Sequence, residues 1–185
     1  MVIISQTSVR LGKSLRVDNG PLRVLGIDPG LTRMGYGVVQ ETRGKLEALA
    51  CGTLTTSPTQ KTSTRLMMLF EQLRLVLSDW RPDVVACERL FFAANALSAV
   101  PAVQASGIAL LLAAQSGLEV TEYTPLQVKQ AVVGNGTASK KQVQYMVERL
   151  VGGFPEPDSA DAADALGVAI THLSSRRLAG LTAAR

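Results

Sequence analysis

The sequence predicts an α/β fold in which a mixed five-stranded sheet is flanked by helices on both faces. Three strand-like segments joined by short turns stand at the start, which is typical of an antiparallel meander. Helical and strand-like patterns then alternate, as they do where helices cover a sheet. The chain has 185 residues, 46% hydrophobic and 18% charged, so it is long and apolar enough to bury one full core.

The first two strands enclose the most informative turn of the sequence. Val24–Ile27 is a short apolar run of the kind found in buried central strands. Asp28 ends this run, Pro29–Gly30 forces a tight turn, and Gly35–Val39 resumes a strand pattern, so we expect a hairpin. Asp28 either caps the turn or is a metal ligand held on a rigid sheet, because a buried carboxylate is costly unless a cation meets it.

A third strand, a helix and a fourth strand follow. Lys45–Thr55 has the pattern of a strand. Apolar residues between Leu66 and Trp80 recur at spacings of three and four, which predicts an amphipathic helix that Arg81 and Pro82 end. Asp83–Glu88 is a strand of the buried type and it also ends in an acid. Two strands therefore carry a carboxylate at the end of an apolar run.

The second half of the chain alternates helices with one more strand. We expect a loop at Arg89–Leu97 and an alanine-rich helix at Ser98–Ser116, with Pro101 in its first turn. Because this helix is apolar on most of its surface, it must be covered on several sides, by the sheet and by a second subunit. The fifth strand is Leu118–Tyr123. Further helices are expected at Pro125–Val133, after the capping residue Ser139, and from Asp158 or Ser159 to Leu173, followed by a basic tail at Ser174–Arg185.

Composition excludes some classes of site and permits others. The net charge of +4 and the pI of about 9.3 permit a polyanionic partner without requiring one. His172 is the only histidine and is interpreted as structural, while Cys51 and Cys87 lie far apart, which excludes a histidine-rich or cysteine-clustered zinc site. Any metal ion must be held mainly by oxygen, which favours magnesium or manganese.

The sequence shows no membrane or secretion segment. No stretch approaches the roughly 18 apolar residues of a membrane-spanning helix. The first 22 residues lack the hydrophobic core of a secretion signal. We therefore expect a cytoplasmic protein with no membrane contact, in which residues 1–22 form a disordered extension.

The last helix carries two acids on one side. Asp161 and Asp164 are three residues apart, so their side chains point the same way from the helix. They are either a solvated acidic first turn, favoured by the helix dipole, or a pair joined by a cation. Together with Asp28 and Glu88 they form an oxygen-only set that suits two magnesium ions about 3.5–4 Å apart. Such a site cleaves phosphodiesters by activating water and stabilising the leaving oxygen.

The motifs around these acids occur in one order from about Arg23 to Leu173. They are Leu25–Gly30, Gly35–Val38, Arg81–Asp83 with Glu88, Gln127–Gly134 and Asp161–Leu166. In this combination the chain resembles the RuvC family of bacterial Holliday junction resolvases. The resemblance implies an RNase H-like fold, a homodimer and metal-dependent, paired, symmetric nicking of four-way DNA junctions in recombination and repair. It also implies that Asp28, Glu88, Asp161 and Asp164 are the metal-binding catalytic acids, with Mg²⁺ as cofactor, Mn²⁺ as a substitute and two ions in each active site.

The resemblance further implies DNA contacts, partners and domain limits. Lys129 and Lys140 match lysines that the family uses near DNA, although solvated lysines are the ordinary alternative, and Lys141 extends the same surface. Phe91 matches an aromatic residue that contacts the junction; Phe92 shares this role or packs inward, and Asn95 matches a polar loop position. The branch-migration proteins RuvA and RuvB are expected partners. The nuclease domain is expected to span residues 23–174, followed by a short basic tail at residues 175–185.

Three other functions remain open at this point. An RNase H-like nuclease that acts on structured RNA would use the same acids, and a junction-binding module would use the same basic surface without cutting. An actin-like or sugar-kinase-like ATPase shares the Asp28–Thr32 turn, but it would need a second phosphate loop and about twice this length.

Overall fold

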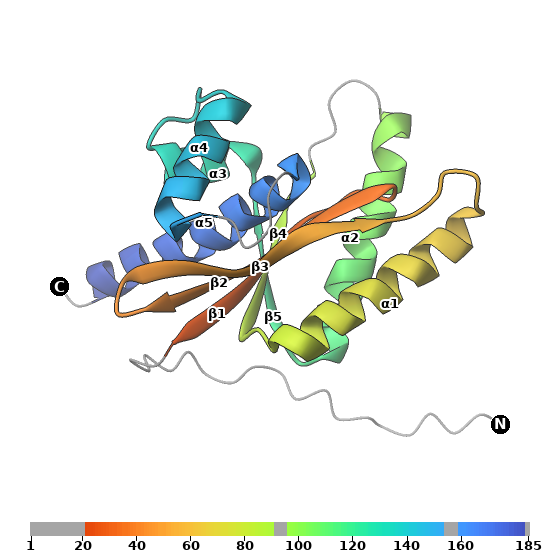
Figure 1. Cartoon of the computed structure of the whole chain (residues 1–185), viewed down its shortest axis with the longest axis horizontal. Helices are drawn as coiled ribbons and strands as arrows, with labels where there is room; N and C mark the ends of the chain where they lie inside the picture. The colour runs from red at the N-terminus through yellow and green to blue at the C-terminus, as the bar shows by residue number, and fades with distance from the viewer. Residues whose placement is uncertain (1–20, 91–95, 154–158, 184–185) are drawn as a thin grey trace.

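A computed structural model describes residues 21–90, 96–153 and 159–183 and shows a mixed sheet with helices on both faces (Figure 1). The strands are β1 (Leu22–Asp28), β2 (Arg33–Thr42), β3 (Lys45–Thr55), β4 (Val84–Glu88) and β5 (Glu119–Tyr123). The helices are α1 (Thr62–Trp80), α2 (Ala96–Gln115), α3 (Pro125–Val133), α4 (Lys140–Val151) and α5 (Ala160–Ala183). This confirms the predicted fold class.

The sheet has the strand order β3-β2-β1-β4-β5. β1, β2 and β3 pair antiparallel, which confirms the expected meander, whereas β1 pairs with β4, and β4 with β5, in parallel. β1 is therefore the central strand, and the carboxyl ends of β1 and β4 meet at the same edge of the sheet. In α/β folds this edge is where functional sites are usually built.

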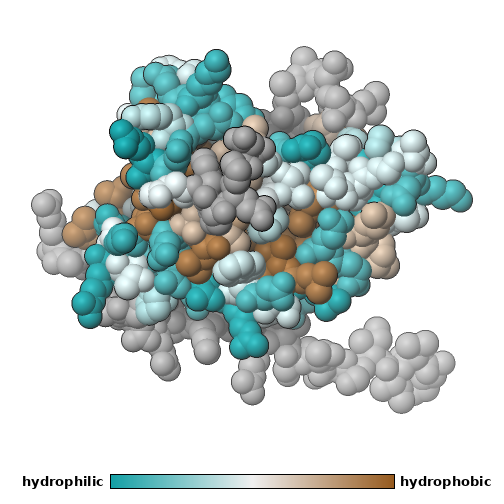
Figure 2. Space-filling view, viewed as in Figure 1, coloured by the Kyte–Doolittle hydropathy of each residue, from teal (hydrophilic) through white to brown (hydrophobic). Residues whose placement is uncertain are grey.

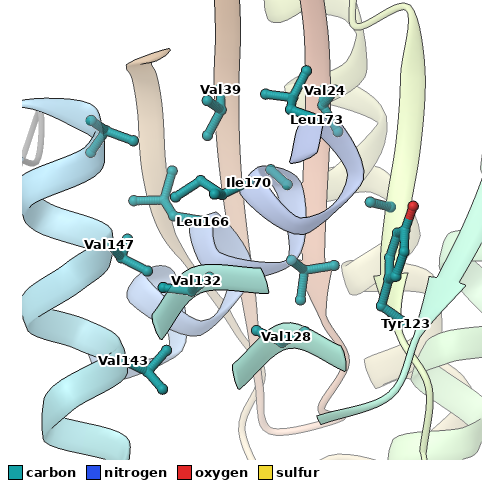
Figure 3. Packing of buried hydrophobic residues seen from close by; sticks show 14 of the residues in the cluster. Val24, Val39, Tyr123, Val128, Val132, Val143, Val147, Leu166, Ile170 and Leu173 are labelled. Carbon is teal, nitrogen blue, oxygen red and sulfur yellow. The ribbon is translucent and has the colours of Figure 1, made fainter. Parts of the chain in front are cut away.

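Alternating strand residues divide the core into two layers. On one face, Leu25, Ile27 and Val85 pack with α1 and α2. On the other face, strand residues such as Val24 and Val39 pack against α5, and α3 and α4 cover α5 from outside (Figures 1 and 3). Leu166, Ile170 and Leu173 of α5 are fully buried between the sheet and the helices α3 and α4. The helix that carries two of the candidate acids is thus clamped from both sides.

Three glycines let the backbone of α5 lie directly on the sheet. A Cβ atom added to Gly26 would stand 2.0 Å from the carbonyl oxygen of Ala165, and one added to Gly35 would stand 2.1 Å from that of Asp161. At Gly37 the added atom would meet the Leu166 side chain at 2.7 Å. No larger residue fits at these positions without moving the helix. The glycines of β1 and β2 therefore set the height of α5 above the sheet.

Local capping signals bound the helices α3 and α4 at both ends. Thr124 and Ser139 form capping boxes at the starts of α3 and α4. Gly134 and Gly152 end these two helices in the left-handed conformation that glycine tolerates best. Ser139 is thus the capping residue that the sequence predicts.

Two predicted helix limits were wrong. α2 begins at Ala96 instead of Ser98, so Pro101 is the sixth residue of the helix and lies beyond its first turn. α5 does not end at Leu173 but continues to Ala183. The reason is a contact distant in sequence: Arg177 pairs with Glu41 and also donates to the Gly44 carbonyl oxygen, which holds the extra turns against the β2–β3 hairpin.

Some predictions lie outside the described residues. These are residues 1–20 of the extension predicted at residues 1–22 and the loop residues Phe91, Phe92 and Asn95. The extension prediction was wrong at Leu22, which begins β1 because it pairs with Glu41 of β2. In the part of the chain that the structure describes, no helix is long and apolar enough to cross a membrane. Cys51 and Cys87 are buried and form no disulfide.

Candidate active site

Asp28 and Glu88 lie side by side where two parallel strands end. β1 and β4 pair up to Ile27 and Cys87, so the next residues of the two strands are Asp28 and Glu88. Since side chains alternate along a strand, both carboxylates project to the face that carries α5, as Val24 and Ala86 do. A hydrogen bond links the two carboxyl groups, and it favours the protonated form of Glu88 and the ionised form of Asp28.

The first two turns of α5 bring Asp161 and Asp164 over the same edge. Ser159 caps the helix, since its hydroxyl accepts a hydrogen bond from the Ala162 N–H. The Ser159 hydroxyl also bonds to Thr53 of β3, which fixes the start of α5 on the sheet. Gly35 pairs with Asp28 across β1 and β2 and leaves room for the Asp161 backbone. Residues far apart in sequence thus converge on one edge.

Burial and mutual repulsion raise the pKa values of both strand acids. Burial, followed by the charge of Asp164, raises the pKa of Asp28 to about 6. Burial, the charge of Asp28 and the hydrogen bond between them raise the pKa of Glu88 to about 8. A neighbouring pair of this kind favours the binding of a cation, which would let both groups ionise.

The two helix acids are each paired with a cation. Arg33 Nε lies 2.6 Å from Asp161 Oδ2, and Lys140 Nζ lies 2.5 Å from Asp164 Oδ2. The hydrogen bond to Asp164 raises the pKa of Lys140. The pKa of Asp164 is nevertheless raised, because its burial outweighs the effect of the nearby ammonium group. Both cations are more than half exposed, so they can leave these carboxylates without disturbing the core.

The donor set fits a hard divalent cation. All four groups are carboxylates, the ligand type that magnesium and manganese prefer. In residues 21–90, 96–153 and 159–183, no three acidic, cysteine or histidine side chains are arranged so that they could hold one metal ion. Two of the four carboxylates are instead turned to Arg33 and Lys140. A bound ion would take the place of these side-chain cations.

The other predicted residues are spread over neighbouring surfaces. Lys140 reaches the acids, as described above, whereas Lys129 is half-buried on α3 and Lys141 is exposed on α4. Lys141 lines an open hollow of about 360 Å³ together with Tyr145 and neighbouring residues of α3 and α4. His172 bonds through Nδ1 to the Tyr123 hydroxyl at 3.1 Å, a contact that accords with a structural role.

Sequence reasoning missed Arg33, which contacts one of the four acids. The strand pattern could have indicated this residue. Arg33 lies two residues before Gly35, so the alternation of side chains along β2 places it on the face that carries α5. The ion pair with Asp161 joins residues 128 positions apart, however, and no local pattern reveals it.

Comparisons with known proteins agree on one family. Residues 24–172 match the family model described as crossover junction endodeoxyribonuclease RuvC. The protein of that name from Syntrophomonas wolfei is 46% identical over 159 residues, which cover 85% of this chain and 91% of that protein. Its counterpart from Roseiflexus sp. is 48% identical over 152 residues, covering 81% and 89% respectively.

Solved structures show the same similarity in three dimensions. Thermus thermophilus RuvC is 37% identical with a TM-score of 0.78, over 85% of this chain and 97% of that one. The T. thermophilus protein in complex with Holliday junction substrate gives a TM-score of 0.80 at 36% identity, over 85% and 96% of the two chains. The yeast mitochondrial resolvase Ydc2 shares the fold, with a TM-score of 0.64 at 16% identity over 84% of this chain and 79% of that one.

Proposed function

Since the chain belongs to the RuvC family and is a crossover junction endodeoxyribonuclease, we propose that Asp28, Glu88, Asp161 and Asp164 carry out its cleavage of Holliday junctions. The family is one of metal-dependent nucleases that act in recombination and repair. The observation that supports this assignment is the convergence of four carboxylates at the edge where β1 and β4 end.

The four carboxylates would hold magnesium, with manganese as a substitute and two ions in each site. When bound, these ions supply an activated water and stabilise the leaving oxygen of an in-line displacement at phosphorus. Asp28 and Glu88 stand on paired strands, so their positions are rigid. Asp161 and Asp164 stand on a helix clamped between the sheet and α3 and α4. The backbone positions of the four acids are thus fixed, while the Asp161 and Asp164 side chains must leave Arg33 and Lys140 to bind a metal ion.

A basic surface next to the acids would hold the DNA. Hydrophilic residues gather over α4 at the upper left of the space-filling view (Figure 2), and α3 and α4 carry Lys129, Lys140 and Lys141. We assign these lysines to phosphate contacts, which position a duplex without reading its sequence. Phe91, Phe92 and Asn95 follow Glu88 in the chain and are assigned to the centre of the junction, where an aromatic side chain can stack on a base.

Symmetric nicking calls for two sites related by a twofold axis, and we assign α2 to the dimer interface. This helix has no charged residue, and it exposes Val100, Val103 and Leu111 at 44%, 39% and 51% of their surface. An apolar helix face of this kind is stabilised by burial against a second copy. RuvA and RuvB are assigned as partners, and the cytoplasm as the place of action.

Nicking of a labelled synthetic four-way junction tests the function. The wild type is expected to cut opposite strands symmetrically with Mg²⁺ and not with EDTA. Asp28→Asn is expected to bind the junction and not cut it, whereas Asp79→Asn, which removes an exposed acid of α1, should cut like the wild type. A wild type that binds without cutting in Mg²⁺ or Mn²⁺ would indicate a binding module. Preferential cutting of structured RNA would indicate a different RNase H-like nuclease.

A further inference from the structure

Arg33 stands at the entrance to the candidate active site. It is the first residue of β2, and its Nε donates to Asp161 Oδ2 at 2.6 Å. The turn before it is tight, because a Cβ atom added to Gly30 would lie 2.2 Å from the Arg33 carbonyl oxygen. The backbone of Arg33 is therefore fixed, while its side chain remains 56% exposed and free to change partner.

The ion pair of Arg33 competes with metal binding. A carboxylate held by a guanidinium has one oxygen less available to a metal ion, and the positive charge of the arginine opposes the approach of a second cation. The pair is also easily broken, because exposed ion pairs contribute little to stability. A divalent ion can therefore displace Arg33 from Asp161, which is 26% exposed.

The displaced guanidinium would have a polyanion within reach. A DNA strand that offers its phosphate to the four acids must run past the first residue of β2, because Arg33 already touches one of these acids. Guanidinium groups bind phosphate in a bidentate fork, which makes arginine well suited to such an exchange.

We propose that Arg33 is a positioning residue that binds Asp161 in the metal-free enzyme and a phosphate of the cut strand once a metal ion has taken Asp161. This inference rests on the proposed function, because it assumes that Asp161 is a metal ligand. It couples the two binding events: the metal frees Arg33 for DNA, and DNA draws Arg33 away from the metal site. Such coupling is reciprocal, so each ligand tightens the binding of the other.

The metal half of the proposal is tested without DNA or cleavage. Thermal unfolding is followed during Mg²⁺ titration of the wild type, Arg33→Gln and Arg33→Lys. Arg33→Gln removes the competing cation and should bind Mg²⁺ about three- to tenfold more tightly, whereas Arg33→Lys should stay close to the wild type. The matched control is Arg74→Gln, which removes an exposed arginine that pairs with Glu71 on α1. Equal Mg²⁺ affinities for the wild type and Arg33→Gln would overturn the proposal.

The DNA half is tested by the salt dependence of junction binding, measured by fluorescence anisotropy with EDTA or with Ca²⁺ as the divalent ion. With Ca²⁺, Arg33→Gln should lower the slope of log affinity against log salt by about 1, the value for one lost phosphate contact. With EDTA, Arg33→Gln should have the same slope as the wild type, because Arg33 of the wild type is then bound to Asp161 and contacts no phosphate. A slope that changes equally in both conditions, or in neither, would overturn the exchange. Failure of the wild type to cut junctions would refute the proposed function instead. The Mg²⁺ titration would still measure how Arg33 affects metal affinity, because it requires neither DNA nor cleavage.

Discussion

Replacing Gly35 with alanine would place a methyl group where the backbone of α5 already lies. The added carbon would stand 2.1 Å from the carbonyl oxygen and 2.6 Å from the carbonyl carbon of Asp161. Since real Cβ contacts are essentially never shorter than 3.0 Å, the start of α5 must retreat from the sheet by about 1 Å. That movement separates Asp161 from Asp28, the partner of Gly35 across β1 and β2.

A displacement of about 1 Å in a catalytic constellation can lower the rate about 100-fold. We therefore expect Gly35→Ala to reduce the single-turnover rate of junction cleavage by this factor. Overpacking should also lower the free energy of unfolding by about 1–3 kcal/mol, which leaves most molecules folded at low temperature. The assay combines quenched-flow cleavage of a labelled junction with urea unfolding of the same preparation.

Gly167→Ala is the matched control, because Gly167 lies on the same helix but an added Cβ atom there makes only ordinary contacts. Its added carbon would lie 3.4 Å from Val128 Cγ1, an ordinary contact, and alanine favours a helix by about 1 kcal/mol over glycine. This variant should cut like the wild type and be equally or more stable. Wild-type cleavage by folded Gly35→Ala would refute the view that close packing of α5 sets the catalytic geometry.

Three further predictions follow from other features. The raised pKa values of Asp28 and Glu88, about 6 and about 8, mean that the folded protein holds more protons than the unfolded one, so the metal-free free energy of unfolding should fall as pH rises from 6 to 8. Urea unfolding at several pH values checks this, and an unchanged pH dependence in Glu88→Gln would contradict it. Leu111→Glu on α2 should yield a monomer in sedimentation and greatly reduce paired nicking, whereas Leu75→Glu on α1 should not, and a dimeric Leu111→Glu would exclude this face. Ser159→Ala removes the cap of α5 and should cost about 1 kcal/mol in urea unfolding, against little change for the exposed Thr182→Ala.

The fold was largely predictable because its signals are local. Apolar runs, turn residues and helix caps mark elements over a few neighbouring positions, and Ser139 and Gly134 act as their residue types suggest. The strand order could not be predicted, because pairing of β1 with β4 depends on how helices cross the sheet. The length of α5 was missed for a similar reason, since Arg177 is held by Glu41 from a distant hairpin.

The candidate site was predictable in composition but not in its charge partners. Asp28 and Glu88 could be paired in advance because each ends a buried strand, and Asp161 and Asp164 because of helical periodicity. Which cation meets which acid depends on tertiary geometry, so Arg33 was overlooked. The assignment of these residues to catalysis remains a prediction that the Asp28→Asn experiment tests.

The placement of α5 also bears on when the protein becomes active during its synthesis. Asp28 and Glu88 end the strands β1 and β4, whereas Asp161 and Asp164 lie on α5, which begins at Ala160. A nascent chain that has released only β1–β5 from the ribosome has half of its carboxylates and an uncovered sheet face. Contacts between such distant residues form slowly in folding. Under the proposed assignment, an incomplete chain lacks half of its metal ligands, and nuclease activity is expected only when the last helix docks.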